Sequence, residues 1–228
     1  MPLHKIIHIN ENTTAYFWHI TEDVTSLFRA VSLRDTSLFR LEGMKSEEHQ
    51  KGFLAVRMLL QHLGYTDYDL TYDEAGKPHL EDKRQKAKDK SEHNIHHPSS
   101  ITKHISISHS HEFSCICISN KLMGIDLEKL KEKTLKIAPR FMEVKHLENL
   151  STSEQIEKAT VIWGVKESIF KIKNEKGISF PEHIFEAEFD LKEGKCEAEL
   201  HFNNQIENFQ IQFYNVEAYI FVCAFPKK

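Results

Sequence analysis

The stretch 151–173, STSEQIEKATVIWGVKESIFKIK, predicts a long helix that carries charged residues within an apolar sequence. Glu167 and Lys171 are four residues apart and share one face of this helix, with Lys166 one step round, near the same side. An exposed Glu–Lys pair is the plainest explanation of the pair alone. Because the charges interrupt such an apolar helix, we favour a cleft lined by Lys166, Glu167 and Lys171. The apolar residues that claim much of the remaining surface are Ile156, Ala159, Trp163, Phe170 and Ile172.

Further along the chain in both directions, the patterns indicate more helix and many strands. Ser151 and Glu154 match a capping box at the start of the helix just described. A second strong helix is predicted at 46–64, where apolar residues recur at helical spacing. Alternation at period two predicts paired strands joined by polar turns at 104–120, 186–202 and 209–225.

The order of these elements, helix then strands and again helix then strands, predicts an α+β protein built from two halves. We expect an N-terminal α+β half at 1–122 and a C-terminal α+β half at 123–228. The halves share an element order but no detectable sequence repeat. The charged and polar stretch 82–100 has no apolar periodicity, and we expect it to form a flexible loop.

Composition narrows the class of protein. The chain has 228 residues, with 30 Lys and Arg against 34 Asp and Glu, so its net charge is −4. Proteins that coat nucleic acids are usually basic, and we therefore expect no nucleic-acid partner. No apolar stretch approaches the roughly 18 residues of a membrane span, and the opening residues lack the apolar core of a signal peptide. The four cysteines suit small buried thiols, and we expect a cytoplasmic location.

The motif GIDLE at 124–128 places two carboxylates on one face of a predicted strand, because Asp126 and Glu128 are two residues apart. Neighbouring carboxylates repel unless a cation lies between them, and hard cations such as Mg²⁺ take oxygen ligands. Gly124 permits close approach of another chain segment or a ligand. A solvent-facing strand edge with alternating acids is the alternative explanation.

Cationic and hydroxyl-bearing residues are scattered over the first half. Arg57 lies on the predicted helix 46–64 and Lys77 lies in a Gly-Lys-Pro turn. A strand end carries Ser106, Ser108, His109 and Ser110. Lysine and arginine charges, with hydroxyl and imidazole donors, are suited to binding phosphate groups. The Ser-His-Ser sequence also suggests a serine hydrolase, but no G-x-S-x-G elbow is present and no acid partner is evident.

Four motifs occur in order along the chain: GKPHL (76–80), ISISHS (105–110), GIDLE (124–128) and WGVKESIFK (163–171). Together they resemble the 4′-phosphopantetheinyl transferases of the larger, surfactin-synthetase type. FLAVR (53–57) and KGISFPEHI (176–184) also look similar to that family, so the resemblance covers most of the chain.

The resemblance implies both a fold and a reaction. Members have a pseudo-twofold pair of similar α+β halves, with the active site in the cleft between them. They transfer the 4′-phosphopantetheine group of coenzyme A to a serine of an apo carrier protein and release adenosine 3′,5′-bisphosphate. By this resemblance we expect an enzyme, a holo-[acyl-carrier-protein] synthase, that serves fatty acid, polyketide or nonribosomal peptide biosynthesis. Two halves already complete such a site, so we expect a monomer.

The resemblance also implies roles for the acidic cluster and for one lysine. Asp126, Glu128 and Glu167 resemble the ligands of Mg²⁺, for which Mn²⁺ can substitute, and Asp126 and Lys171 would also contact the pyrophosphate of coenzyme A. Lys171 resembles the lysine that stabilises the pyrophosphate as its bond breaks. Glu167 is also a candidate for the base that takes the proton of the carrier serine, directly or through a water.

Other residues resemble contacts to coenzyme A itself. Lys77, Ser108 and His109 resemble groups that contact the nucleotide and its 3′-phosphate. Lys166 and Arg57 are expected to contact phosphate as well.

Two other function classes fit parts of the pattern. A metal-dependent phosphodiesterase or nuclease would also gather Asp126, Glu128 and Glu167 around Mg²⁺, but the charge of −4 and the lack of a sustained basic face argue against a nucleic-acid track. A non-catalytic coenzyme A-binding protein would be expected to lose one of the carboxylates or Lys171, and all are present.

Overall fold

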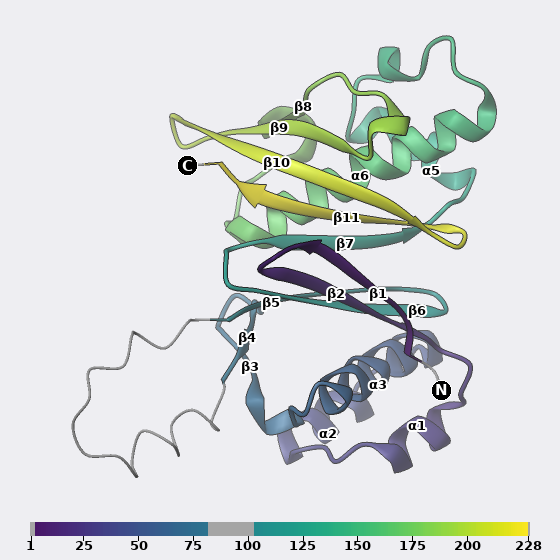
Figure 1. Cartoon of the computed structure of the whole chain (residues 1–228), viewed down its shortest axis with the longest axis vertical. Coiled ribbons are helices and arrows are strands. Elements are labelled where there is room, and N and C mark those ends of the chain that lie inside the picture. Colours follow the sequence, from purple (N-terminus) through teal and green to yellow (C-terminus); the bar gives the residue numbers. More distant parts are fainter. Residues whose placement is uncertain (1–2, 82–102, 228) are drawn as a thin grey trace. The chain divides into compact units, whose positions relative to one another are not determined.

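The chain is a mixture of helices and strands in the computed structural model, which describes residues 3–81 and 103–227 (Figure 1). The α+β class predicted from the sequence is therefore confirmed. The expected flexible loop at 82–100, with its three histidines, lies outside the described residues. No helix in the described part of the chain is both long enough and apolar enough to cross a membrane.

Two compact units divide the chain. Unit 1 contains Met1–Ile105 and His111–Lys121, and unit 2 contains Ser106–Ser110 and Leu122–Lys228. The division at 121/122 falls one residue from the predicted boundary at 122/123. The sequence prediction differs at Ser106–Ser110, which it placed in the first half.

Unit 1 combines helices with two sheets. The larger sheet has the order β1-β2-β6-β5, and the smaller one pairs β3 with β4. Helix α3 packs on β2 and β6 and buries its apolar face, including Leu54, Leu59 and Leu60. The strands are β1 (Leu3–Asn10), β2 (Thr13–His19), β3 (Leu70–Tyr72), β4 (Pro78–Leu80) and β6 (Phe113–Ser119), together with the first two residues of β5 (His104–Ser110), whose other residues belong to unit 2. The helices are α1 (Val24–Ala30), α2 (Asp35–Glu42), α3 (Glu47–His62) and the short η1 (Asp67–Asp69).

Unit 2 is an antiparallel sheet of order β7-β11-β10-β9-β8, against which helix α6 packs. The strands are β7 (Gly124–Lys129), β8 (Ile184–Glu186), β9 (Lys195–Phe202), β10 (Gln205–Val216) and β11 (Tyr219–Pro226). The helices are α5 (Lys133–Ile137), η2 (Ala138–Arg140), η3 (Val144–Leu147), α6 (Thr152–Lys173), α7 (Phe180–His183) and η4 (Leu191–Glu193).

Local sequence accounts for the ends of α6 and for the tight turns. The capping box is present: Ser151 accepts a hydrogen bond from the backbone N–H of Glu154, whose carboxylate accepts one from the N–H of Ser151. Asn174 ends the helix at φ 51°, in the left-handed region that asparagine tolerates. Asn203 and Asn204, both at positive φ, form the two-residue turn between β9 and β10. The predicted helices at 46–64 and 151–173 and the strand pairs at 104–120 and 209–225 are therefore confirmed. The pair predicted at 186–202 is wrong in its first strand, because β8 ends at Glu186 and η4 precedes β9.

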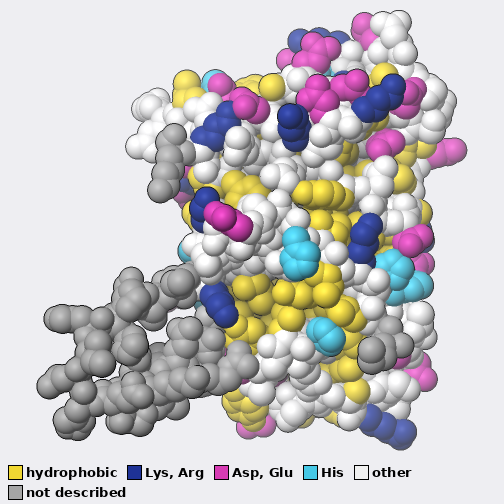
Figure 2. Space-filling model, in the orientation of Figure 1, with side chains coloured by type: hydrophobic (Ala, Val, Ile, Leu, Met, Phe, Trp, Pro, Cys, Tyr) yellow, Lys and Arg dark blue, Asp and Glu magenta, His cyan; other side chains and the backbone are white. Residues whose placement is uncertain are grey.

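Charged side chains are spread over the surface visible in Figure 2. Lys and Arg side chains on that face occur singly or beside Asp and Glu, and they do not form one continuous basic band.

Candidate active site

Two glycines allow α6 to lie close to the sheet of unit 2. A Cβ atom at Gly124 of β7 would lie 2.0 Å from the backbone oxygen of Ser168 in α6. One at Gly164 of α6 would lie 2.5 Å from Cγ2 of Val222 in β11. The close approach that the sequence suggested at Gly124 is therefore made by α6. Gly164 weakens the helix by its propensity, but it permits this contact.

Replacing Gly124 by alanine is therefore expected to destabilise the protein. The atom that the new methyl group would meet belongs to the backbone of α6, so relief requires the helix to move, and overpacking of this kind costs about 1–3 kcal/mol. Gly43→Ala is the matched control, because its Cβ would have no neighbour closer than 3.6 Å. Thermal unfolding of both variants tests this expectation, and equal stability of the two would contradict it.

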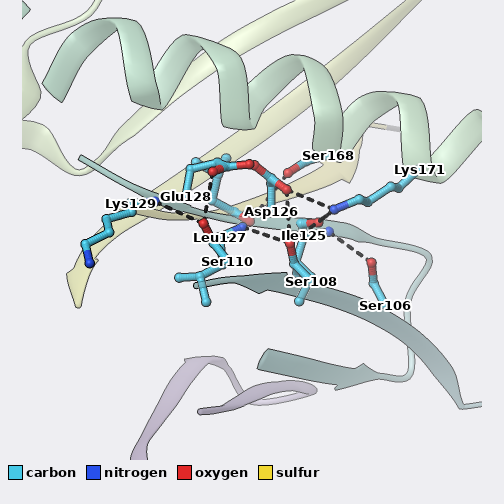
Figure 3. Close-up of polar contacts among 11 residues, drawn as sticks. Ser106, Ser108, Ser110, Ile125, Asp126, Leu127, Glu128, Lys129, Ser168 and Lys171 are labelled. Carbon is cyan, nitrogen blue, oxygen red and sulfur yellow. Dashed lines mark hydrogen bonds and ion pairs between the residues drawn. The ribbon is translucent and has the colours of Figure 1, made fainter. Parts of the chain in front are cut away.

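Asp126 lies at the centre of a polar cluster in unit 2 and is 4% exposed. One carboxylate oxygen, Oδ1, accepts hydrogen bonds from Oγ of Ser108 at 3.0 Å and from Nζ of Lys171 at 2.9 Å (Figure 3). The other oxygen, Oδ2, is buried and has no hydrogen-bond partner within the described part of the chain. An unsatisfied buried carboxylate oxygen is costly, so this atom is suited to receive a cation or a proton donor.

Lys171 of α6 donates three hydrogen bonds, two to β7 and one to β5. Besides Asp126, its Nζ donates to the backbone oxygen of Ile125 at 2.9 Å and to Oγ of Ser108 at 3.3 Å. Its side chain remains 29% exposed. The structure thus brings together Lys171 and Asp126, which are 45 residues apart in sequence.

Two further carboxylates share the electrostatic environment of Asp126. Burial raises the pKa of Glu128 to about 7, with the charge of Asp126 as the second cause and that of Glu167 contributing. Burial and then the charge of Asp126 also raise the pKa of Glu167. The charge of Asp126 therefore opposes ionisation of both glutamates, which is the behaviour expected where a cation would be held.

The donor atoms fit a hard divalent cation, although the cluster is not a closed metal site. Among residues 3–81 and 103–227, no three His, Cys, Asp or Glu side chains are arranged as a complete ligand group. The site nevertheless offers the unpartnered Oδ2 of Asp126 and the carboxylates of Glu128 and Glu167. Oxygen donors of this kind suit Mg²⁺, which binds through few carboxylates and keeps water or substrate oxygens as its other ligands.

The pKa of Glu128 predicts a pH dependence of stability. The pKa of Glu128 is about 7 in the folded protein and 4.5 ordinarily, so between these pH values the folded state binds a proton that the unfolded state has lost. The free energy of unfolding therefore falls as the pH rises from 4.5 to about 7. Glu128→Gln removes the titrating group. Without divalent cations, we expect the stability gained by Glu128→Gln to be small at pH 5 and larger at pH 8, measured by thermal unfolding. The same gain at both pH values would contradict this assignment, and Glu182→Gln, at an exposed position, is the control.

The predicted role of Ser108 in contacting nucleotide is not supported by its position. Its hydroxyl donates to Asp126 and accepts from the backbone N–H of Leu127 at 3.1 Å and from Lys171. One donor and two acceptor sites are the full capacity of a hydroxyl, so none remains for coenzyme A. Ser108 instead holds the groups of the acidic cluster.

The prediction that Lys166 shares a face with Glu167 and Lys171 is wrong. Lys166 is 2% exposed, and its Nζ pairs with the carboxylate of Glu186 at 2.8 Å and donates to the backbone oxygen of Ile184 at 2.5 Å. Neighbouring helix positions are separated by about 100°, which is enough to direct Lys166 into the core of unit 2.

The predicted phosphate contact of Arg57 is also corrected. Arg57 is 3% exposed, its Nε donates to Asp67 at 2.9 Å, and its guanidinium lies 3.5 Å from the ring centroid of Phe53. The guanidinium also donates to the backbone oxygen of Phe53, so its polar contacts lie inside unit 1. A buried charge needs such partners.

The other two predicted contacts to coenzyme A lie on exposed or half-buried parts of the chain. Lys77 is half-buried in a turn in which Asp73 accepts a hydrogen bond from its backbone N–H at 2.8 Å. Burial, followed by the charges of Lys77 and His79, lowers the pKa of His104, so these basic groups are neighbours in unit 1. His109 is exposed on β5. The roles of Lys77 and His109 stay predictions.

Sequence reasoning grouped Ser106 and Ser110 with the side chains suited to phosphate and did not predict their contacts to β7. Ser110 donates to the carboxylate of Glu128 at 3.1 Å, and Ser106 accepts from the backbone N–H of Ile125 at 3.1 Å. The available signal was the spacing of the three serines in ISISHS, which places them on one face of a strand.

Known protein families were compared with the chain, and the match covers the segment that contains Asp126, Glu128, Glu167 and Lys171. Residues 122–223 match the family model of the 4′-phosphopantetheinyl transferase superfamily. Over this segment, the chain is similar to members of that superfamily. The segment includes β7 and α6, and therefore all three carboxylates and Lys171.

Curated relatives are named 4′-phosphopantetheinyl transferases. The chain is 35% identical over 85 residues to the 4′-phosphopantetheinyl transferase gsp of Aneurinibacillus migulanus, covering 36% of this chain and 35% of that protein. It is 36% identical over 81 residues to a 4′-phosphopantetheinyl transferase of Bacillus subtilis, covering 34% of this chain and 36% of the relative. The chain thus spans little more than a third of the length of the 4′-phosphopantetheinyl transferases it matches.

Proposed function

We propose that this protein transfers the 4′-phosphopantetheine group of coenzyme A to a serine of an apo carrier protein, with Mg²⁺, and releases adenosine 3′,5′-bisphosphate. The superfamily match over 122–223 supports the reaction class. The observation that carries the proposal is the pairing of Asp126 with Lys171 beside an unpartnered carboxylate oxygen. An oxygen suited to a cation would then lie beside a positive charge, as transfer from a pyrophosphate requires.

Asp126, Glu128 and Glu167 are the residues that would hold the metal. When bound, Mg²⁺ would act as a Lewis acid and template for the pyrophosphate of coenzyme A. The fixed position of Asp126, held through Oδ1 by Ser108 and Lys171, leaves Oδ2 for this purpose.

Lys171 would stabilise the negative charge that develops on the leaving bisphosphate. Its ammonium has three donors, and all three have partners on Asp126, Ile125 and Ser108. To donate to a phosphate oxygen, Lys171 must exchange one of these partners. Its partial exposure makes the ammonium accessible to the substrate.

Glu167 would accept the proton of the carrier serine, directly or through a water. Its raised pKa brings it closer to neutral pH, where a general base is most effective. A carboxylate that also binds the metal has less capacity to act as a base, so the two roles of Glu167 compete.

The remaining parts of the proposal concern partners and arrangement. Lys77 and His109 would contact the nucleotide, and a pseudo-twofold arrangement of the halves would complete the site. We propose a cytoplasmic monomer that has coenzyme A and an acyl or peptidyl carrier protein as partners and no nucleic acid.

Intact mass spectrometry of an apo carrier protein tests the proposed function. After incubation with this protein, coenzyme A and Mg²⁺, the carrier should gain the mass of one phosphopantetheine arm, and EDTA should abolish the gain. The same experiment with the serine of the carrier replaced by alanine is the control. Absence of a gain on both an acyl carrier protein and a peptidyl carrier domain, while coenzyme A still binds, would favour the non-catalytic alternative.

A further inference from the structure

Strand β7 lies at an edge of the sheet of unit 2, where its outward backbone N–H groups have no neighbouring strand in that sheet. Unpaired groups at a sheet edge require other partners when they are buried. Three serine hydroxyls of β5, on residues that belong to unit 2, supply them. The hydroxyls of Ser106, Ser108 and Ser110 accept from the N–H groups of Ile125, Leu127 and Lys129, at 3.1, 3.1 and 3.4 Å, respectively.

Two of these serines also bind carboxylates of the acidic cluster. Ser108 donates to Oδ1 of Asp126 at 3.0 Å, and Ser110 donates to Oε2 of Glu128 at 3.1 Å (Figure 3). The hydroxyl of Ser108 therefore bonds both the carboxylate of Asp126 and the backbone N–H of the next residue, Leu127. The hydroxyl of Ser110 does the same for Glu128 and Lys129. Ser106 accepts a hydrogen bond from the backbone N–H of Ile125, and its hydroxyl has no carboxylate partner within the described residues.

We propose that Ser108 and Ser110 are positioning residues that fix the carboxylates of Asp126 and Glu128 for the metal, whereas Ser106 only satisfies the backbone of β7. The bond from Ser108 occupies Oδ1, so Oδ2 of Asp126 is the oxygen that would receive the cation. The bond from Ser110 occupies one oxygen of Glu128 in the same way. Such outer partners of metal ligands orient them and are worth about 10- to 100-fold in metal affinity or activity.

The test compares alanine variants along the same strand. Ser106→Ala, Ser108→Ala and Ser110→Ala each remove an acceptor from a backbone N–H, so all three should lower the melting temperature, by about 2–8 °C. Only Ser108→Ala and Ser110→Ala should weaken Mn²⁺ binding, by about 10- to 100-fold, in electron paramagnetic resonance titrations with Mn²⁺ alone. Only these two should lower kcat for transfer to a carrier, with KM for coenzyme A little changed.

Threonine variants separate the hydroxyl from the shape of the side chain. Ser108→Thr and Ser110→Thr keep a donor and suit a strand, so at least one should restore Mn²⁺ affinity relative to its alanine counterpart. Parental Mn²⁺ affinity in both alanine variants, or an equal loss in Ser106→Ala, would overturn the proposal. A parental protein that binds no Mn²⁺ would also overturn it.

This inference depends on the proposed function for its kinetic readout, but its failure can be distinguished. If the parental protein modifies no carrier and the Mn²⁺ contrast is present, the transfer function is wrong and the positioning role stands. If the parental protein modifies a carrier and the serine variants match it in both Mn²⁺ affinity and kcat, the positioning role is wrong.

Discussion

Glu167→Gln should abolish transfer of the phosphopantetheine arm without lowering stability. The substitution removes a proposed metal ligand and a proposed base, and loss of a base alone costs about 10²- to 10⁴-fold in rate. Burial and the charge of Asp126 already oppose ionisation of Glu167. A neutral side chain of the same shape should therefore leave the melting temperature unchanged or raise it. Intact mass of the carrier over time, together with thermal unfolding, measures both effects.

The two roles of Glu167 have separate signatures. If its main role is to bind the metal, higher Mg²⁺ concentrations should recover part of the rate of Glu167→Gln. If it is the base, Mg²⁺ should recover nothing and the acidic limb of the pH–rate profile should disappear. Glu182→Gln, at an exposed position on α7, is the control and should keep the parental rate. A parental rate in Glu167→Gln would remove this residue from the active site.

Local patterns predicted the helix, and they placed Glu167 and Lys171 on one face of it, because such patterns depend on neighbours in sequence. The capping box of Ser151 and Glu154 requires residues three apart, and the shared face of Glu167 and Lys171 requires residues four apart. The two carboxylates of GIDLE were likewise placed on one side of β7 by the period of a strand. That these two sets meet is a property of the tertiary fold, and the motifs indicated it only through the family resemblance.

Arg57 and Ser108 show where sequence reasoning failed. Both have side chains suited to phosphate, but each already has partners within the protein. Buried Arg57 forms an ion pair with Asp67. The hydroxyl of Ser108 is hydrogen-bonded to the carboxylate of Asp126 and to the backbone N–H of Leu127. A residue type indicates which ligands are chemically suitable. It does not indicate whether a partner within the protein has already taken the group.

Lys166→Met should strongly destabilise the protein and leave the affinity for coenzyme A unchanged. Its ammonium is the cation beside Glu186, whose side chain is only 4% exposed. Removing one partner of a buried ion pair leaves an uncompensated charge and costs about 3–5 kcal/mol. Burial lowers the pKa of Lys166, and the charge of Glu186 opposes this effect, so Glu186 favours the charged form of Lys166. Chemical denaturation measures the loss, and KM for coenzyme A measures the contact predicted from sequence.

A second substitution tests whether the unpaired carboxylate causes the loss. Adding Glu186→Gln to Lys166→Met removes the buried charge and should recover part of the stability. The recovery is incomplete because the backbone oxygens of Ile184 and Phe180 still lack the donor that Lys166 provided. Lys173→Met is the control on the same helix: its partners, Glu207 and Glu175, are partly exposed, and a surface ion pair contributes at most about 1 kcal/mol. A stable Lys166→Met with a raised KM for coenzyme A would instead place Lys166 on the phosphates, because only a lysine that reaches the substrate changes KM without changing the fold.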